Sequence, residues 1–232
     1  MELQQKLDLV YDVDAVLRGQ GADAAILRAR RPGLVKIAED ARQKSVSLLH
    51  PKLIYRIYQA EGVRHERLLL HDGLKIESKL VTEHLAAADK IIIILATIGS
   101  ELEEHVSRIW DDNMVYALAL DGAGSAAVEA LANAACQYFE QMAVEGGLQA
   151  SIPLSPGMVD WSVAEGQPQI FQLLGDEANA VNLTPSYVMI PKKSLTMVMG
   201  IGDQLKSSGK TCDYCSMRDT CRYQDHYLHA AN

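Results

Sequence analysis

Five consecutive aliphatic residues, Ile91–Leu95, constrain the fold of this chain more than any other feature. The run follows Asp89 and Lys90 and ends shortly before Gly99. A short apolar run with such borders is typical of a β-strand that is covered on both faces. We therefore expect a sheet with other elements packed against both of its sides.

The first part of the chain, to about residue 50, has the apolar spacing of helices. Pro32 suits the first turn of a helix over Pro32–Leu49, where its missing N–H costs nothing. The pattern then changes to short strands around the Asp72-Gly73 turn signal. Further strands are expected at residues 53–58, 67–71, 187–190 and 194–201, and short helices at 83–88 and 169–174.

A long Ala- and Leu-rich stretch predicts a helix from Asn113 to about Val144, with a potential break at Asp121–Gly124. The small residues there indicate tight packing against another backbone. Ser100 and Glu103, after the buried strand, have the spacing of a capping box for the helix that follows them. Together these patterns predict an α+β fold, a twisted and mostly antiparallel sheet flanked by helices, over residues 1–205. A Cys-rich extension follows at 206–232.

Composition excludes several classes of protein. The chain has 232 residues, 48% of them hydrophobic, and a net charge of −8, so it has material for a core and lacks the basic face of a nucleic-acid-binding protein. The basic run Arg28–Arg31 is short. No apolar run reaches the length of a membrane span, and the N-terminus does not resemble a secretion signal. We therefore expect a cytoplasmic protein with neither nucleic acid nor membrane as its partner.

Three segments, taken in order, resemble the activation domain of cobalamin-dependent methionine synthase. They are the Ala96-Thr97-Ile98-Gly99 strand end, the DGAGSAAVEALA stretch at 121–132, and the Ser155-Pro156-Gly157 segment with its continuation to Gly200. The continuation includes Asp160-Trp161, Gln167, Met189-x-Pro191 and Lys193-Ser194. The order and spacing make the match specific, and it covers roughly residues 53–202.

The resemblance implies a cleft for S-adenosylmethionine facing the cobalt of a corrinoid, lined by Ser155, Pro156, Gly157 and Met158. It also implies that Glu129 holds the ammonium group of the ligand. The family has an Arg two residues before the Ser and a Tyr after the Gly, where this chain has Pro153 and Met158. Proline cannot replace the bidentate grip of Arg on a carboxylate. The match therefore predicts the fold more firmly than the ligand.

Three cysteines near the C-terminus, Cys212, Cys215 and Cys221, have the spacing of metal ligands. The fourth ligand is open. Cys136 would complete the four thiolates of an iron–sulfur cluster, whereas His226 or His229 would complete a zinc site. The spacing does not decide between the two metals. The functional context favours iron–sulfur, because a Co(II) corrinoid needs an electron before it can be methylated and a cluster could supply one.

These features lead to three hypotheses. The first is an accessory protein that reactivates a corrinoid (cobalamin) methyltransferase system by reduction of the Co(II) corrinoid, by its S-adenosylmethionine-dependent methylation, or by both. The second is an electron-transfer iron–sulfur module. The third is a non-catalytic corrinoid-binding protein with a structural zinc tail. All three have a corrinoid-binding protein or cobalamin-dependent methyltransferase as partner, and the sequence leaves open whether the chain is itself an enzyme.

Overall fold

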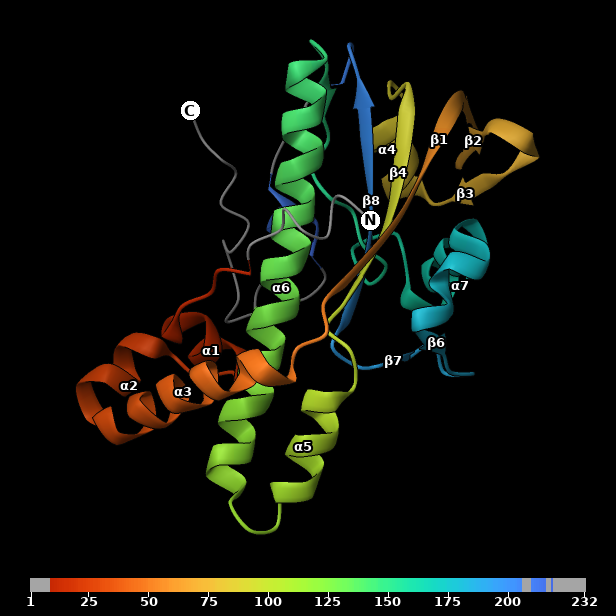
Figure 1. Ribbon diagram of the computed structural model, residues 1–232. Coiled ribbons are helices and arrows are strands. Elements are labelled where there is room, and N and C mark those ends of the chain that lie inside the picture. The colour runs from red at the N-terminus through yellow and green to blue at the C-terminus, as the bar shows by residue number, and fades with distance from the viewer. Residues whose placement is uncertain (1–8, 206–209, 216–217, 219–232) are drawn as a thin grey trace. The chain divides into compact units, whose positions relative to one another are not determined.

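The computed structural model describes residues 9–205, 210–215 and 218 (Figure 1). The chain divides into two compact units. The first, which we call the helical unit, comprises Met1–Leu53, Ala96–Ala134 and Met189–Leu195. The second, the sheet unit, comprises Ile54–Leu95, Ala135–Val188 and Thr196–Asn232. The predicted boundary at 205/206 stays a prediction, because most of the segment after it lies outside the described residues.

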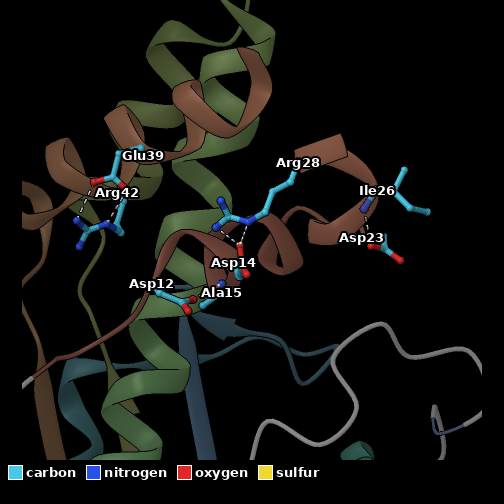
Figure 2. A network of polar contacts seen from close by, with 8 residues as sticks. All are labelled: Asp12, Asp14, Ala15, Asp23, Ile26, Arg28, Glu39 and Arg42. Carbon is cyan, nitrogen blue, oxygen red and sulfur yellow. Dashed lines mark hydrogen bonds and ion pairs between the residues drawn. The ribbon is translucent and has the colours of Figure 1, made fainter. Parts of the chain in front are cut away.

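Short helices dominate the helical unit. Asp12 and Asp23 explain where the first two begin, since their carboxylates accept hydrogen bonds from Ala15 N at 2.8 Å and Ile26 N at 3.0 Å (Figure 2). Pro32 lies in the first turn of the third helix, as predicted. The elements are α1 (Val13–Gly19), α2 (Ala24–Arg30), α3 (Pro32–Ser45), η1 (Val46–Leu48), α5 (Glu101–Ile109), the first part of α6 (Met114–Glu145) and β7 (Met189–Ile190).

Two ion pairs form between charged side chains of these helices. Arg28 on α2 donates to Asp14 on α1 through Nε at 3.0 Å and Nη2 at 2.5 Å, and Arg42 pairs with Glu39 within α3 at 2.8 Å (Figure 2). Arg42 and Gln43 hold the pKa of the Glu39 carboxyl below its usual value by donating hydrogen bonds to it. The basic run Arg28–Arg31 thus contributes one of its charges to a contact between α1 and α2.

Helix α6 packs against α1 at a position where only glycine fits. A Cβ on Gly122 would lie 2.7 Å from the carbonyl oxygen of Val16 and 2.7 Å from Cγ of Gln20. The predicted role of the small residues in tight packing is therefore confirmed at this position. The predicted break at Asp121–Gly124 is wrong, because α6 runs without interruption from Met114 to Glu145.

Replacing Gly122 with Ala should therefore destabilise the protein. Alanine normally stabilises a helix interior by about 1 kcal/mol over glycine, but the added Cβ must displace the backbone of α1, and overpacking costs about 1–3 kcal/mol. We expect a net loss of about 1 kcal/mol in the free energy of unfolding, measured by urea denaturation. Gly33→Ala on α3 is the matched control, since its Cβ would meet no atom within 4 Å. A G122A variant as stable as G33A would contradict this packing.

The expectation that no segment has the length of a membrane span requires a correction. Helix α6, with 32 residues, is long and apolar enough to cross a membrane, judged by length and composition only. However, 56% of its most apolar window is buried inside the structure, as in the core helix of a soluble protein. The helix is therefore only a weak indication of a membrane segment.

A six-stranded antiparallel sheet, in the order β3-β2-β1-β4-β8-β5, forms the centre of the sheet unit (Figure 1). Strand β4 is buried from Ile91 onward, which confirms the prediction of a strand covered on both faces. The strands are β1 (Lys52–Arg64), β2 (Arg67–Leu70), β3 (Lys75–Glu77), β4 (Lys90–Thr97), β5 (Gln149–Ala150) and β8 (Ser194–Gly202), with the short β6 (Asn182–Leu183) elsewhere in the unit. The helices are α4 (Lys79–Leu85), α7 (Val163–Leu174), η2 (His71–Gly73), η3 (Gly175–Ala180) and η4 (Thr211–Tyr214).

The side chains of β8 show which helices cover each face, because successive residues of a strand point to opposite sides. Thr196 donates to the side-chain oxygen of Gln167 on α7 at 3.0 Å, whereas Met197 contacts Cys136 on α6, with 3.3 Å between the sulfurs. Gly200, on the same side as Thr196, lies close to Leu85 and Ala88 at the end of α4. Helices α4 and α7 therefore cover one face, and the second part of α6 covers the other.

Helix α5 begins directly after Ser100, as expected, but the capping box predicted there is wrong, and so is the predicted start of α7. Ser100 has a helical backbone and donates its hydroxyl to Glu104 at 2.7 Å, while Glu103 accepts the backbone N–H of Lys193 at 2.8 Å, so the predicted capping box does not form. The capping box lies instead at Ser162 and Glu165, where α7 begins. The helix predicted at 169–174 thus starts earlier, at Val163, and contains Pro168 in its interior.

Candidate functional site

Lys193 joins the segments of the family resemblance within the helical unit. Its ammonium group contacts Asp121 on α6 at 2.9 Å and the hydroxyl of Ser125 at 2.8 Å, and its backbone N–H donates to Glu103 on α5. Only 15% of the Lys193 side chain is exposed, so this ion pair is better shielded from water than an ordinary surface pair. Lys193 therefore fixes α5 and α6 relative to the segment that leads into β8.

The strand end at Ala96–Gly99 belongs to the same cluster. The carbonyl of Lys193 accepts the N–H of Ile98 at 3.2 Å, and Ser194 donates its hydroxyl toward that of Thr97 at 2.8 Å. Gly99 has a positive φ of 79°, and a Cβ there would lie 3.1 Å from Cβ of His50. These contacts hold the strand end at Ala96–Gly99 against the segment at Lys193 and Ser194.

Glu129 lies on α6, two turns beyond Asp121. Burial raises the pKa of its carboxyl from 4.5 to about 7. Burial is the only cause of this shift, and no hydrogen-bonding or charged partner among the described residues contributes to it. A carboxylate whose charge is destabilised by burial and has no partner is typical of a functional position.

A polar stripe on α6 includes Glu129. Asp121, Ser125, Glu129 and Asn133 follow one another at intervals of four residues, so they lie along one side of the helix. The side-chain oxygen of Asn133 is buried and has no hydrogen-bond partner among the described residues. The polar side chains at the Lys193 end of this stripe already have hydrogen-bond partners, whereas Glu129 and Asn133 retain unused hydrogen-bonding capacity.

The loop Ser155–Met158 lies in the sheet unit, where the edge of the sheet positions it. After β5 the chain continues along β8, with Ser151 N donating to Gly200 O at 2.9 Å and Leu154 paired with Val198 through two backbone hydrogen bonds. Residues 151–154 are buried and residues 155–158 are half-buried. The loop therefore begins where the chain leaves the sheet edge.

Backbone hydrogen bonds fix the shape of this loop. Gly157 has a positive φ of 101°, which favours glycine, and its N–H donates to Trp161 O at 2.8 Å. Met158 N donates to Ser155 O at 3.2 Å, and the Met158 thioether lies 3.4 Å from Ser155 N. The four predicted residues thus form one compact turn. Glu129 belongs to the other unit.

Trp161 is a buried residue that packs beside the loop. Its side chain is 1% exposed, and its indole N–H has no hydrogen-bond partner among the described residues. Gly166 on α7 packs directly under the loop, because a Cβ there would lie 2.7 Å from Pro156 Cγ and 2.8 Å from the Trp161 ring. The position of the loop therefore depends on Gly166.

The two family positions that differ in this chain are also visible. Pro153, at the Arg position, is buried beside Leu154 in the segment that comes after β5. Met158, at the Tyr position, turns its side chain back toward Ser155 N. Neither residue can donate a charge-assisted hydrogen bond to a ligand carboxylate.

The described part of the Cys-rich extension contacts this loop. Met158 pairs with Cys215 as an antiparallel bridge, and Val159 N donates to Tyr214 O at 2.9 Å. Among the residues that the structure describes, no three His, Cys, Asp or Glu side chains are grouped to hold a metal, so Cys136 is not brought together with Cys212 and Cys215. The predicted ligands Cys221, His226 and His229 lie outside the described residues.

Comparison with solved structures identifies the fold. The reactivation domain of MetH, solved bound to AdoHcy, superimposes with a TM-score of 0.58 over 87% of this chain and 73% of that one, at 17% identity. This chain has the MetH reactivation domain fold. The fold predicted from the three motifs is therefore confirmed. No protein-family model matches the chain, and no curated protein does.

Several residues of the candidate site had no role assigned from the sequence. Lys193 and Trp161 stand within the family motifs, but nothing in their spacing indicates that one joins two helices and the other supports the loop. Tyr214 lies between two predicted metal ligands, and its contact with the loop has no sequence signal.

Proposed function

We propose that this protein is a cytoplasmic accessory factor that docks on a corrinoid-carrying protein and returns inactive Co(II) corrinoid to an active state. The observation that supports it most is the MetH reactivation domain fold, found over 87% of the chain. In this proposal, the loop Ser155–Met158 is the part of the protein that faces the corrin ring. Its residues are half-buried, and backbone hydrogen bonds hold it in one conformation.

In the first form of this function, S-adenosylmethionine is the methyl donor. The MetH domain was solved with AdoHcy, which is what S-adenosylmethionine becomes after losing its methyl group. An external reductant supplies one electron to Co(II), and the resulting Co(I) attacks the methyl carbon. The C–S bond breaks, its electron pair stays on sulfur, and methyl-Co(III) and AdoHcy are formed. The protein would contribute by holding the sulfonium methyl over the cobalt.

Glu129 is our candidate for the ammonium group of this ligand. An unpartnered carboxylate with a pKa near 7 gains more from a cation than a solvated carboxylate does. The carboxylate of the ligand has no corresponding Arg, because Pro153 occupies that position. We therefore expect weak binding of S-adenosylmethionine.

The second form is electron delivery to the corrinoid by a metal centre in the Cys-rich extension. The contact of Tyr214 and Cys215 with the loop favours it, because that contact would hold such a centre beside the corrin-facing residues. Cys212 and Cys215 are soft thiolate donors that suit iron or zinc. Only iron–sulfur would carry an electron; zinc would make the extension structural, as in a non-catalytic corrinoid-binding protein.

Docking is tested by calorimetric titration with the cobalamin-binding domain of a methionine synthase, loaded with Co(II) cobalamin. We expect a one-to-one complex. Met158→Asp should weaken it at least about tenfold, because a charge would be buried against an apolar ring face. Val144→Asp is the control, since Val144 is 72% exposed on α6. A failure of the wild-type protein to bind the loaded domain would overturn the proposal.

A further inference from the structure

The Cys212–Cys215 turn and the Ser155–Met158 loop are joined by backbone pairing. Met158 and Cys215 form an antiparallel bridge, and the adjacent Val159 N–H donates to Tyr214 O at 2.9 Å. Backbone pairing of this kind fixes register, so a given residue of the turn lies opposite a given residue of the loop. Cys215, a predicted metal ligand, is thereby the direct partner of the last residue of the loop.

The turn has a second anchor, on helix α4. The ring of Tyr214 packs edge-on against that of His84, with 4.4 Å between centroids and 80° between planes. Thr211, at the start of η4, is 5% exposed. Since Tyr214 stands between the two cysteines, this contact holds the middle of the turn.

The turn is also organised by its own hydrogen bonds. Lys210 N donates to the Asp213 carboxylate at 2.9 Å, Asp213 N donates to Lys210 O at 2.9 Å, and Cys215 N donates to Cys212 O at 3.3 Å. Both cysteines are half-buried. Two thiols two residues apart on a closed turn have the arrangement by which a metal is chelated.

We infer that Cys212 and Cys215 bind a thiolate-coordinated metal centre, zinc or the iron of a cluster, whose binding fixes the Ser155–Met158 loop. Metal coordination orders the turn, and the ordered turn supplies Tyr214 O and Cys215 to the loop. Metal content and loop conformation are then coupled by the residues between them. The role of the loop in facing a corrinoid rests on the proposed function. The coupling itself does not, because the contacts between the turn and the loop involve neither corrinoid nor S-adenosylmethionine.

Trp161 provides a direct readout of the loop. Its backbone N–H donates to Met158 O at 3.1 Å, and its backbone carbonyl accepts the N–H of Gly157. The chain contains 2 tryptophans, so Trp110→Phe leaves Trp161 as the only one. In this background we expect Zn²⁺, added to chelator-stripped protein under reducing conditions, to shift the Trp161 emission at one equivalent. We also expect it to slow hydrogen exchange at the Val159 amide at least about tenfold.

Three variants separate metal binding from coupling. Cys215→Ser should abolish both the binding of Zn²⁺ and the Trp161 response, whereas Cys136→Ala, in a buried position on α6, should retain both. His84→Ala keeps the thiols but removes the anchor of Tyr214. It should weaken Zn²⁺ binding about tenfold, since about 1.4 kcal/mol of docking would be lost from the bound state, and it should reduce the Trp161 shift.

Two results would overturn the inference. One is that the stripped wild-type protein binds no Zn²⁺; the other is that it binds Zn²⁺ with no change in Trp161 emission or in Val159 exchange. Metal and sulfide analysis of anaerobically purified protein distinguishes a zinc site from an iron–sulfur cluster. Because no corrinoid is present, these outcomes are independent of the docking titration, so failure of the inference can be told apart from failure of the proposed function.

Discussion

Glu129→Gln should make the protein more stable at pH 8 by about 3 kcal/mol and leave its stability at pH 4 unchanged. The folded-state pKa of Glu129 is raised from 4.5 to about 7 by burial. Between these values the folded protein keeps a proton that the unfolded chain has lost, so stability falls as pH rises through this window. A shift of one pKa unit corresponds to about 1.36 kcal/mol. Gln carries no charge and removes this loss.

The measurement is the free energy of unfolding by urea at several pH values, for E129Q and the wild-type protein. The difference between the two curves isolates Glu129, because other groups contribute equally to both. Among them is His84, whose pKa is lowered by burial and whose contribution has the opposite sign. Glu145→Gln, at an exposed position of the same helix, should change stability by less than about 0.5 kcal/mol. A difference curve that does not vary with pH would show that the Glu129 carboxyl is not destabilised by burial.

Gly166→Ala should destabilise the protein by about 2 kcal/mol and displace the Ser155–Met158 loop. An added Cβ would lie 2.7 Å from Pro156 Cγ, 2.8 Å from Pro156 Cβ and 2.8 Å from the Trp161 ring. A proline ring and a buried indole cannot rotate away, so the loop must move as a unit. Overpacking of about 1–3 kcal/mol then outweighs the usual helix preference for alanine.

Gly33→Ala provides the control for this prediction too, because its Cβ meets open space on a helix. It should be neutral or stabilise the protein by up to about 1 kcal/mol. Stability is measured by urea denaturation and loop displacement by Trp161 emission in the Trp110→Phe background. If Gly166→Ala unfolds at the same denaturant concentration as Gly33→Ala, the close packing of α7 beneath the loop is not correct.

The architecture could be predicted from the sequence because its strongest signals come from burial. Ile91–Leu95 is apolar at every position, and a short strand buries all of these side chains only when it is covered on both faces. The helix start at Pro32 and the loop glycine at Gly157 have local causes, a missing N–H and a positive φ. The three motifs then gave the fold, although no single motif would have done so.

The errors arose where a distant residue overrides a local pattern. Ser100 and Glu103 have capping-box spacing, but the Glu103 carboxylate instead accepts a hydrogen bond from the backbone N–H of Lys193, far along the chain. Gly122 and Gly124 predicted a helix break, yet α6 continues without interruption. These glycines instead leave room for the close packing of α1 and other neighbours. The helix predicted at 169–174 starts earlier, because the Ser162–Glu165 capping box begins α7 at Val163.

The candidate site could be predicted only in part. The residue types at Ser155–Met158 and at Cys212 and Cys215 carry a chemical signal in the sequence. Their contact does not, because backbone pairing between Met158 and Cys215 depends on no particular side chain. The raised pKa of Glu129 likewise depends on burial, which a single glutamate in a helix does not reveal.

The central claim is that this protein returns Co(II) corrinoid to an active state, and one anaerobic visible-spectrum experiment tests it most directly. The protein is mixed with the Co(II)-loaded cobalamin domain and a low-potential one-electron reductant, with and without S-adenosylmethionine. We predict that the Co(II) spectrum is lost faster than in a mixture without the protein. The product should be methyl-Co(III) and an equal amount of AdoHcy when the donor is present, or Co(I) when the metal-loaded protein only transfers electrons. A Co(II) spectrum that decays at the same rate with and without the protein, in both mixtures, would contradict the account.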